Sequence, residues 1–492
     1  MALSPYSLLS ERSRTLLRIF GAIIALSATI SLPPLFLAWW WNEPSATAFL
    51  ESFLVAGIAG FILWFPVRNA HYEMRLRDGF LIVSGVWIIA ILVTALPFML
   101  TEPNLSYTDA VFEAASGLTT TGATVIVGIE HLPKSVLFYR ASLCYFGGMG
   151  IVILAVAILP MLRIGGMQLF RAETTGPQKD SKLTPRIADT AKALWLVYTG
   201  LVLLCTLSFW VGGMTFFDAI CHGMSAVATG GFGNYDASFG KWNIPLLDRI
   251  AHLVMFLGGR SFGRHWYAWR RATLGHYKAD AEFVSFFWIC AVVSVVVALA
   301  IWIGGRFESP VEALRHATFQ VVSNITTTGF VTTGFVDWPG LAPLALIMVG
   351  FIGGCAGSTS GGMKVARVQM VVRQGYRELK QLVHPKGQFL VKVGGKRVSE
   401  SVVISVAGFC TLYILSFLVM TLALTADGVD IVTAFSAIAA CMNNMGPGLG
   451  AVASHFRDMS DFAVWVCSFA MVLGRLEVFT LLVLLTPQFW RD

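Results

Sequence analysis

Long runs of hydrophobic residues recur from one end of the chain to the other, separated by short polar stretches. An α-helix needs about 20 predominantly apolar residues to cross the roughly 30 Å hydrocarbon layer of a membrane. Ten runs approach or exceed that length, near 18–41, 46–66, 79–100, 136–162, 190–212, 245–262, 283–304, 341–369, 401–425 and 461–486. The pattern therefore predicts an all-α integral membrane protein with about ten transmembrane helices.

Basic residues sit at alternate ends of these runs. They precede the first run and follow the second, fourth, sixth and eighth, where the stretches 163–189, 263–280 and 370–399 carry most of them. Lys and Arg are retained on the cytoplasmic side of membrane proteins. We therefore expect both termini to be cytoplasmic, with ten spans returning the chain to the side on which it starts.

Between the last eight runs, which pair up, lie four shorter and more polar stretches on the outer side. They read AVFEAASGLTTTGAT (110–124), AICHGMSAVATGGFG (219–233), ATFQVVSNITTTGFV (317–331) and AFSAIAACMNNMGPG (434–448). Each holds a helix-like segment, then small polar residues, then a glycine, and the motif returns about every 100 residues. The chain therefore contains four re-entrant pore-loop repeats in the expected fold, arranged with fourfold pseudo-symmetry.

A helix-start signal precedes each of the four stretches. Ser106, Thr215, Ser309 and Asp427 each stand three residues before an Asp or Glu, in an arrangement similar to a capping box. Each short helix is thus expected to begin outside and to end near the membrane midplane, where its partial negative C-terminal end favours a cation.

Extended backbone that follows such a helix is tolerated at this depth only where it lines a cavity, and its carbonyl groups can replace the water around a potassium ion. The residues expected to line this selectivity filter are Thr120, Thr121, Gly122, Thr229, Gly230, Gly231, Thr327, Thr328, Gly329, Asn444, Met445 and Gly446.

Two features are predicted beneath this filter. The eighth run contains GFIGGCAGSTSGGMK (350–364), and each glycine in a helix interior costs about 1 kcal/mol. We expect a broken helix with an irregular loop, although close packing of small residues between helices is an alternative. Arg475 lies near the middle of the last run, where a charge requires a cavity or a partner. It is interpreted as a positive charge in the ion path, the alternative being a local pair with Glu477 or a cage of carbonyl oxygens; Arg140 is interpreted as structural.

Composition and charge exclude other classes of protein. The chain of 492 residues is 56% hydrophobic and 13% charged, with a mean hydropathy of +0.70, whereas soluble proteins carry about a quarter charged residues. The net charge of +7 forms no basic face, so nucleic acid is not an expected partner. The eight cysteines lie in apolar segments without a CxxC pair and are interpreted as buried hydrophobic residues.

Several of these motifs together resemble one family. The stretches SGLTTTGAT, SNITTTGF and NNMGPGLG, the linkers FRAETTGPQKDSKLTPRIADTAKALW and QLVHPKG, the loop GGCAGSTSGGMK and the terminal GRLEVFTLLVLLTPQFW are similar to those of the Trk/Ktr/HKT superfamily of potassium transporters, specifically its bacterial TrkH-type subunits. The resemblance covers nearly the whole chain.

The resemblance implies an organisation and a function. The organisation is an N-terminal two-helix segment (1–70) followed by pore repeats at 71–189, 190–282, 283–400 and 401–492. The transported ion is K⁺, there is no tightly bound cofactor, and a glycine at the position of Gly122 favours potassium over sodium. A gate is expected at Arg475 and in the loop at Gly353, Gly354, Gly357, Ser358, Thr359, Ser360, Gly361 and Gly362.

The same resemblance implies partners and a location. The expected assembly is a homodimer in the bacterial inner membrane, regulated by a cytosolic ring of the TrkA type that binds a nucleotide, either NAD or ATP/ADP. Flux through it is either channel-like or coupled to protons or sodium.

Two other function classes are less consistent with the residues. A secondary transporter built from inverted repeats would need polar groups scattered at the midplane, whereas the four stretches here run the same way. An enzyme is not expected, because HExxH is absent and GSTSGGMK lacks the spacing of a phosphate-binding loop.

Overall fold

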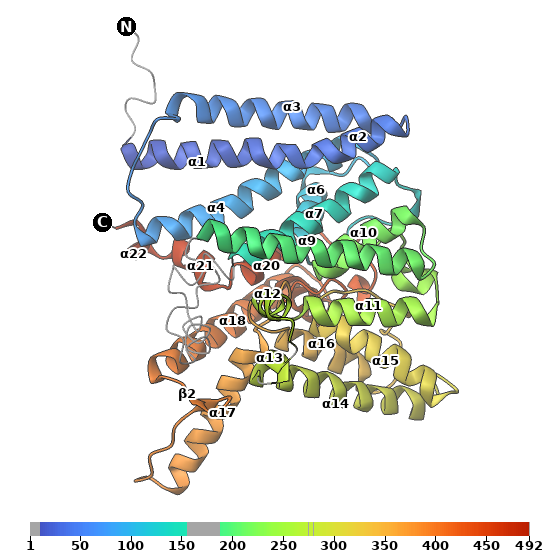
Figure 1. Cartoon of the computed structure of the whole chain (residues 1–492), viewed down its shortest axis with the longest axis vertical. Coiled ribbons are helices and arrows are strands. Elements are labelled where there is room, and N and C mark those ends of the chain that lie inside the picture. Colours follow the sequence, from blue (N-terminus) through green and yellow to red (C-terminus); the bar gives the residue numbers. More distant parts are fainter. Residues whose placement is uncertain (1–9, 155–186, 274, 279, 492) are drawn as a thin grey trace.

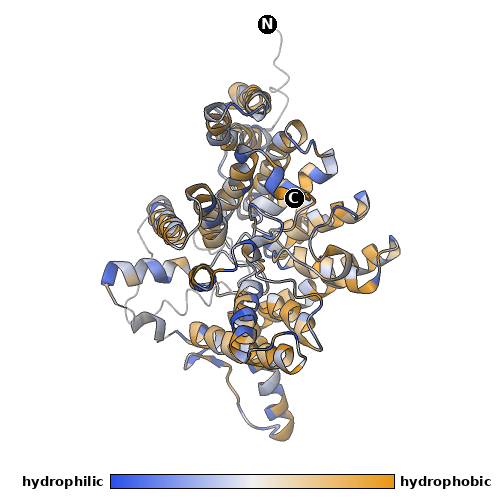
Figure 2. Cartoon of the chain, turned by 90° about the vertical axis from the view of Figure 1, so that its right-hand side faces the viewer, coloured by the Kyte–Doolittle hydropathy of each residue, from blue (hydrophilic) through white to orange (hydrophobic). Residues whose placement is uncertain are grey.

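The structure, a computed structural model, describes residues 10–154, 187–273, 275–278 and 280–491, and nearly all of its regular elements are helices (Figure 1). Among the described residues, seven helices are long and apolar enough to cross a membrane: Glu11–Trp40, Ser45–Val67, Arg77–Leu100, Lys134–Ile153, Ala191–Val211, Ala281–Ile303 and Glu400–Ala426. Figure 2 shows the long helices coloured largely as hydrophobic. These helices confirm the predicted multi-pass helical membrane fold in outline.

The N-terminal segment is a pair of long helices that lie side by side (Figure 1). α1 (Glu11–Ala28) continues through a turn of 3₁₀-helix into α2 (Leu32–Trp40), and α3 (Ser45–Trp64) runs back along it. The helices meet at glycines, since a Cβ at Gly21 would lie 2.8 Å from Trp64 N and one at Gly60 would lie 2.6 Å from Ala25 N. Small residues allow helix backbones to approach this closely in membranes.

The remaining chain forms four sets of helices, each with a long helix, a short helix and a following helix. They are α4 (Leu76–Thr94), α6 (Tyr107–Leu118) and α7 (Lys134–Ile153); α9 (Ile187–Val211), α10 (Phe216–Val227) and α11 (Pro245–Gly258); α14 (Ala281–Ile303), α15 (Pro310–Ile325) and α16 (Ala342–Ile352); and α18 (Glu400–Ala426), α19 (Ile431–Met442) and α20 (Asp461–Arg475).

The four sets contact one another in cyclic order. Each short helix packs against both helices of its own set, and the following helix of each set also packs against the short helix of the next: α7 on α10, α11 on α15, α16 on α19 and α20 on α6. Because the last contact returns to the first set, the four short helices are held around one closed circle.

Side-chain caps start the four short helices, largely as predicted. Ser106 Oγ accepts from Asp109 N at 3.2 Å and Thr215 Oγ1 from Asp218 N at 3.1 Å. In α15 the hydroxyl of Ser309 accepts from Val311 N at 3.3 Å, one residue earlier than expected.

The predicted cap of the fourth short helix, Asp427, is wrong. α19 begins at Ile431, and the cap is Asp430, whose carboxylate accepts from Thr433 N at 3.0 Å. Asp427 instead stands at the C-terminal end of α18, where it accepts a hydrogen bond from Ser460 Oγ.

In the described part of the chain, three of the predicted runs are sharply broken, and the end of the fourth run, 155–162, lies outside the described residues. The break in the eighth run is confirmed: α16 ends at Ile352, Gly353 has φ +73°, and α17 (Val365–Val383) begins twelve residues later. The sixth run was expected to be continuous, but α11 stops at Gly258 and the chain restarts as α12 (Phe262–Arg271).

The last run, 461–486, was predicted as one span, and the structure bends it sharply after Arg475. α20 and the segment Phe479–Leu485, which begins with α21 (Phe479–Leu482), meet at an angle of 109°. Glu477 and Val478 hold φ values of 56° and 54° at the bend. Neither residue is a helix breaker by type, so the hydrophobic pattern carries no sign of this bend; Glu477 is fixed there by an ion pair to Arg367 on α17, with N and O atoms 2.5 Å apart.

The remaining elements are short. They are α5 (Leu96–Leu100), α13 (Gly275–Lys278), α22 (Pro487–Trp490) and a two-stranded hairpin, β1 (Lys392–Val393) with β2 (Lys396–Arg397), which the sequence did not predict. Gly394 and Gly395 form its turn with φ values of 55° and 79°, which matches the two-residue turns that suit hairpins. α17 and this hairpin extend away from the body of the chain (Figure 1).

Candidate functional site

Each short helix ends in the same backbone motif. The C-terminal hydrogen bonds Thr121 N to Ser116 O, Gly230 N to Ser225 O, Thr328 N to Ser323 O and Met445 N to Ala440 O all measure 2.8 Å. The residue before each donor is left-handed, with φ of 51° at Thr120, 51° at Thr229, 54° at Thr327 and 53° at Asn444. This Schellman-type ending normally uses glycine. A threonine or asparagine in its place is uncommon and marks all four sites.

A glycine follows two residues after each left-handed residue. Gly122, Gly231, Gly329 and Gly446 have φ values of 82°, 73°, 81° and 99°. Glycine is the residue that takes up such a backbone without steric strain. The chain can therefore turn away from the helix end and continue as extended backbone at four equivalent positions.

These glycines bring the four segments together in a ring. A Cβ at Gly122 would lie 2.6 Å from the carbonyl oxygen of Gly230. In the same way, a Cβ would lie less than 3.0 Å from a carbonyl oxygen of the next segment at the other three positions: Gly231 against Thr328, Gly329 against Met445 and Gly446 against Thr121. The four segments that contain the twelve predicted filter residues thus meet in one closed ring, with backbone carbonyls of one segment packed against the backbone of the next.

The predicted irregular loop lies against the helix ends of this ring. The two ends of the loop 353–364 lie close together, since a Cβ at Gly362 would lie 2.8 Å from Gly353 Cα. Thr359 Oγ1 donates to Val227 O at 3.2 Å and accepts from Thr229 Oγ1 at 3.1 Å, and Gly361 N donates to Thr327 Oγ1 at 2.6 Å. A Cβ at Gly361 would lie 3.1 Å from Asn444 Cβ. The loop therefore contacts three of the four left-handed residues.

Arg475 contacts the fourth. Its guanidinium donates to Thr120 Oγ1, its side chain is 5% exposed, and its Nε has no hydrogen-bond partner among the residues that the structure describes. The alternative of a local pair with Glu477 is wrong, because Glu477 binds Arg367 instead. Within the described part of the chain no carboxylate pairs with Arg475, so its charge is left facing the helix ends of the ring.

Comparison with known proteins gives this arrangement a family. The profile of TrkH, described as a cation transport protein, matches residues 45–491. The chain belongs to the TrkH family. The Trk system potassium uptake protein TrkH of Vibrio parahaemolyticus is 48% identical over 97% of this chain and 99% of its own length. The crystal structure of the potassium transporter TrkH from the same organism has 46% identity, covers 97% of this chain and 100% of its own, and superposes with a TM-score of 0.90.

Relatives in other bacteria carry similar names. The Trk system potassium uptake protein TrkH of Escherichia coli K12 is 45% identical over 97% of this chain and 99% of its length. TrkG of the same strain, also named a potassium uptake protein, is 38% identical over the same shares. The relatives are thus named as transport proteins and not as enzymes.

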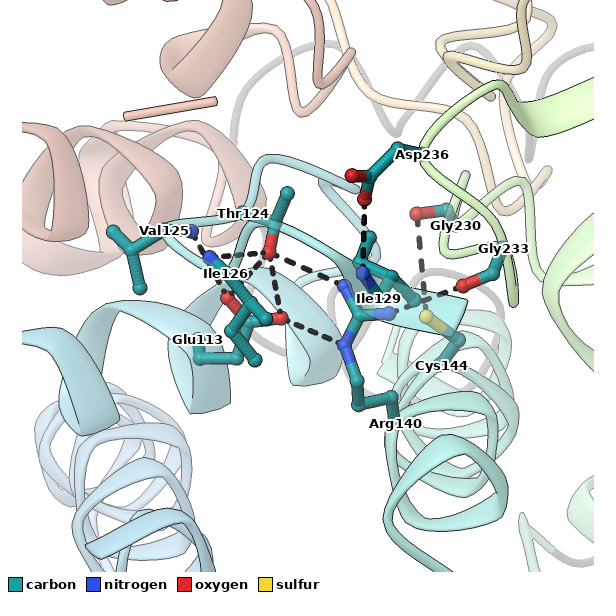
Figure 3. Close-up of polar contacts among 10 residues, drawn as sticks. All are labelled: Glu113, Thr124, Val125, Ile126, Ile129, Arg140, Cys144, Gly230, Gly233 and Asp236. Atoms are coloured by element: carbon teal, nitrogen blue, oxygen red, sulfur yellow. Dashed lines mark hydrogen bonds and ion pairs between the residues drawn. The ribbon is translucent and has the colours of Figure 1, made fainter. Parts of the chain in front are cut away.

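Sequence reasoning missed the carboxylate that stands behind the ring. Glu113 on α6 is fully buried, and its Oε1 lies 2.8 Å from Nε of Arg140 (Figure 3). An ionised side chain inside the hydrophobic layer is costly, so an intramembrane glutamate and arginine are a signal to look for a pair. The structure supplies the partner of Arg140 that the sequence left unassigned.

A second missed residue anchors the irregular loop. Glu282, in the first turn of α14, accepts hydrogen bonds from Ala356 N at 2.7 Å and from Ala366 N at 3.2 Å. At the other side of the loop Lys364 donates to Ser358 Oγ at 3.4 Å and to Ser360 O. The loop is therefore held by side chains at its base as well as by the helix ends of the ring.

Proposed function

We propose that this chain takes up potassium ions across the inner membrane of a bacterium through the ring of four loops, which acts as the selectivity filter. The observation that carries the proposal is the ring itself, since the segments that follow the C-terminal ends of four short helices touch one another in cyclic order. Partial negative helix ends favour a cation, and carbonyl oxygens can replace its water. The names of the relatives support potassium as the ion.

The direct test compares potassium and sodium uptake in a host that lacks its own potassium uptake. We expect this chain, together with its cytosolic partner, to restore growth at low potassium. Sodium uptake at least as fast as potassium uptake would contradict the assignment of the ring as a potassium filter.

The first residue to test is Gly122. A serine there must hold a φ of 82°, and its Cβ would lie 2.6 Å from the Gly230 carbonyl oxygen, so two neighbouring segments would have to move apart. We expect the ratio of potassium to sodium uptake to fall by about tenfold, which corresponds to about 1.4 kcal/mol of lost discrimination. The matched control is Gly305→Ser, because Gly305 has a φ of 72° with no atom within 4 Å of a Cβ. Equal selectivity of the two folded variants would count against the filter.

We further propose that the loop at 353–364 and Arg475 form the gate. The support is their contact with all four left-handed residues at the helix ends of the ring, where a small movement of the loop changes the width of the path. Glu282 holds the base of the loop, where it accepts hydrogen bonds from Ala356 N and Ala366 N.

The proposed assembly is a homodimer with cytoplasmic termini, bound to a cytosolic TrkA-type ring that carries the nucleotide, NAD or ATP/ADP. Basic residues and a protruding helix on the expected cytoplasmic side support the binding of this cytosolic partner. Of the three basic stretches, 163–189 lies almost entirely outside the described residues, whereas 263–280 and 370–399 are almost fully described. The stretch 370–399 includes most of the protruding α17 and its hairpin, and there Leu382 and Val383 are 77% and 71% exposed.

Exchange of these stretches tests the partner. Replacing the exposed hydrophobic residues of α17 with serine and its basic residues with glutamine should weaken capture of the ring by at least about tenfold, because both apolar burial and charge attraction are lost. The measurement is a pull-down with the purified ring at fixed salt. Binding that survives exchange of all three stretches would exclude this docking surface.

A further inference from the structure

The outer side of the ring is crossed by one buried ion pair, which the proposed function leaves unused. Arg140 on α7 and Glu113 on α6 are 1% and 0% exposed, and Nε lies 2.8 Å from Oε1 (Figure 3). A buried pair of this kind persists only where further hydrogen bonds satisfy the remaining donors and acceptors. The partners of those remaining groups therefore indicate what the pair holds in place.

The carboxylate of Glu113 binds the segment that follows the filter glycine of the first set. Its Oε2 accepts from Thr124 Oγ1 at 2.9 Å and from Val125 N at 3.2 Å. Thr124 is the second residue after Gly122. The outer end of the first filter segment is thus tied to the short helix behind it.

The guanidinium of Arg140 connects the same position to the second set. Its NH2 donates to Thr124 Oγ1 at 3.3 Å and its NH1 donates to Gly233 O at 3.1 Å. Its carbon also lies 4.1 Å from the centre of the Phe232 ring. Gly233 is the second residue after Gly231, so one side chain binds equivalent positions of two neighbouring segments.

α7 also packs closely against the second filter segment at positions after Arg140. A Cβ at Gly230 would lie 2.7 Å from Cys144 Sγ, one turn after Arg140. A Cβ at Gly148 would lie 2.9 Å from Ala228 Cβ. One face of α7 therefore packs against the second segment over its whole depth, with Arg140 as the polar end of that face.

The other three sets have no such pair in the described part of the chain. The position nine residues before the filter glycine is Glu113 in the first set, and it is His222, Gln320 and Ala437 in the others. His222 Nδ1 lies 2.9 Å from Asp218 O within its own helix, and Gln320 Nε2 donates to Thr333 O at 3.1 Å. Arg315 on α15 does bind Asp248 on α11, but Arg315 is 25% exposed. Among the described residues, a fully buried ion pair at the position nine residues before the filter glycine thus occurs at the seam between the first and second sets alone.

We propose that Arg140 and Glu113 are positioning residues that fix the spacing of the first two filter segments and thereby contribute to the discrimination between potassium and sodium. The inference rests on the proposed function, since it assigns a role within that filter. Neither side chain touches the ion. They act through Thr124 and Gly233, and a change in the spacing of these two residues alters the carbonyl oxygens two positions away.

The test uses substitutions that keep the site polar. Arg140→Lys keeps the positive charge, but one ammonium group cannot reach Glu113, Thr124 and Gly233 as the fork of a guanidinium does. Glu113→Gln keeps an oxygen for Val125 N and removes the charge. We expect each variant to lower the potassium-to-sodium flux ratio of the purified full-length protein in lipid vesicles by about tenfold. A change of this size corresponds to the loss of one hydrogen bond to a charged group, if that loss slows the flux of potassium but not of sodium.

The control is Arg12→Gln, which removes a different ion pair, at 2.7 Å to Asp78, between the first turns of α1 and α4. It should leave the flux ratio unchanged. If the parent protein prefers potassium and both variants keep that ratio, the positioning role is wrong while the proposed function stands. If the parent shows no preference for potassium, the proposed function itself fails.

A purely structural pair gives a different result. It predicts less folded protein with an unchanged flux ratio in the molecules that do fold, which would overturn the proposal. If Arg140→Lys does not fold, the double variant Arg140→Gln with Glu113→Gln removes both charges and keeps the hydrogen-bonding groups. An unchanged flux ratio in that folded variant would also overturn the proposal, and a lowered ratio would support it.

Discussion

Replacing Arg475 with alanine should raise the basal cation flux by about two orders of magnitude. Two unit charges about 6 Å apart at an effective dielectric of about 20 repel by roughly 3 kcal/mol, which changes a rate by about 100-fold when it acts on the barrier. The charge is not neutralised locally, because Glu477 is paired with Arg367. The variant Arg475→Lys should keep part of the barrier, since the charge remains. The measurement is potassium flux in vesicles at matched protein amount, without the cytosolic partner.

A neighbouring variant separates charge from packing. Glu477→Gln alters the same bend but removes a negative charge, so it should leave the basal flux equal or lower. Because a Cβ at Gly474 would lie less than 3.0 Å from Met442 O, α20 packs tightly on the end of α19 and fixes the position of Arg475. If alanine at 475 lowers the flux or leaves it unchanged, Arg475 is a structural charge and the barrier lies elsewhere.

Shortening the irregular loop should also open the path without the partner. Deletion of residues 355–360 removes the contacts of Thr359 with the second helix end, and the stems can rejoin because Gly353 and Gly362 already touch at the base of the loop. We expect the basal flux to rise by at least about tenfold, since the loss of about 1.4 kcal/mol of obstruction is sufficient. The measurement is again flux in vesicles at matched protein amount.

A single substitution at Thr359 tests the same contact without shortening the loop. Thr359→Val keeps the volume but loses the hydrogen bonds to Val227 O and to Gly258 O, which measure 3.2 and 3.1 Å. It should raise the flux by less than the deletion does. Thr421→Val is the matched control, because among the described residues the Thr421 hydroxyl bonds only to Phe417 O, within α18. Folded variants that remain as closed as the parent would show that the loop serves packing and not gating.

The sequence alone predicted the helical membrane fold, the four short helices and the break in the eighth run. These features are encoded locally, in runs of apolar residues, in the cap signals of Ser106 and Thr215, and in the glycines between 350 and 362. The positions of the four glycines also follow from the repeated motif. The repeat also predicted that the four segments surround one pathway, but not which residues touch, because the contacts that close the ring join residues far apart in the chain.

Other features were decided only by the tertiary structure. The bend after Arg475 occurs at Leu476, Glu477 and Val478, which are ordinary helix residues, and the ion pair of Glu477 with Arg367 fixes it from another helix. The partner of Arg140 is 27 residues earlier in the chain, too far for any helical spacing to predict. Sequence patterns thus determined most of the helices of this protein. The pairing of buried charges, Arg140 with Glu113 and Arg367 with Glu477, determined contacts between segments that the sequence did not predict.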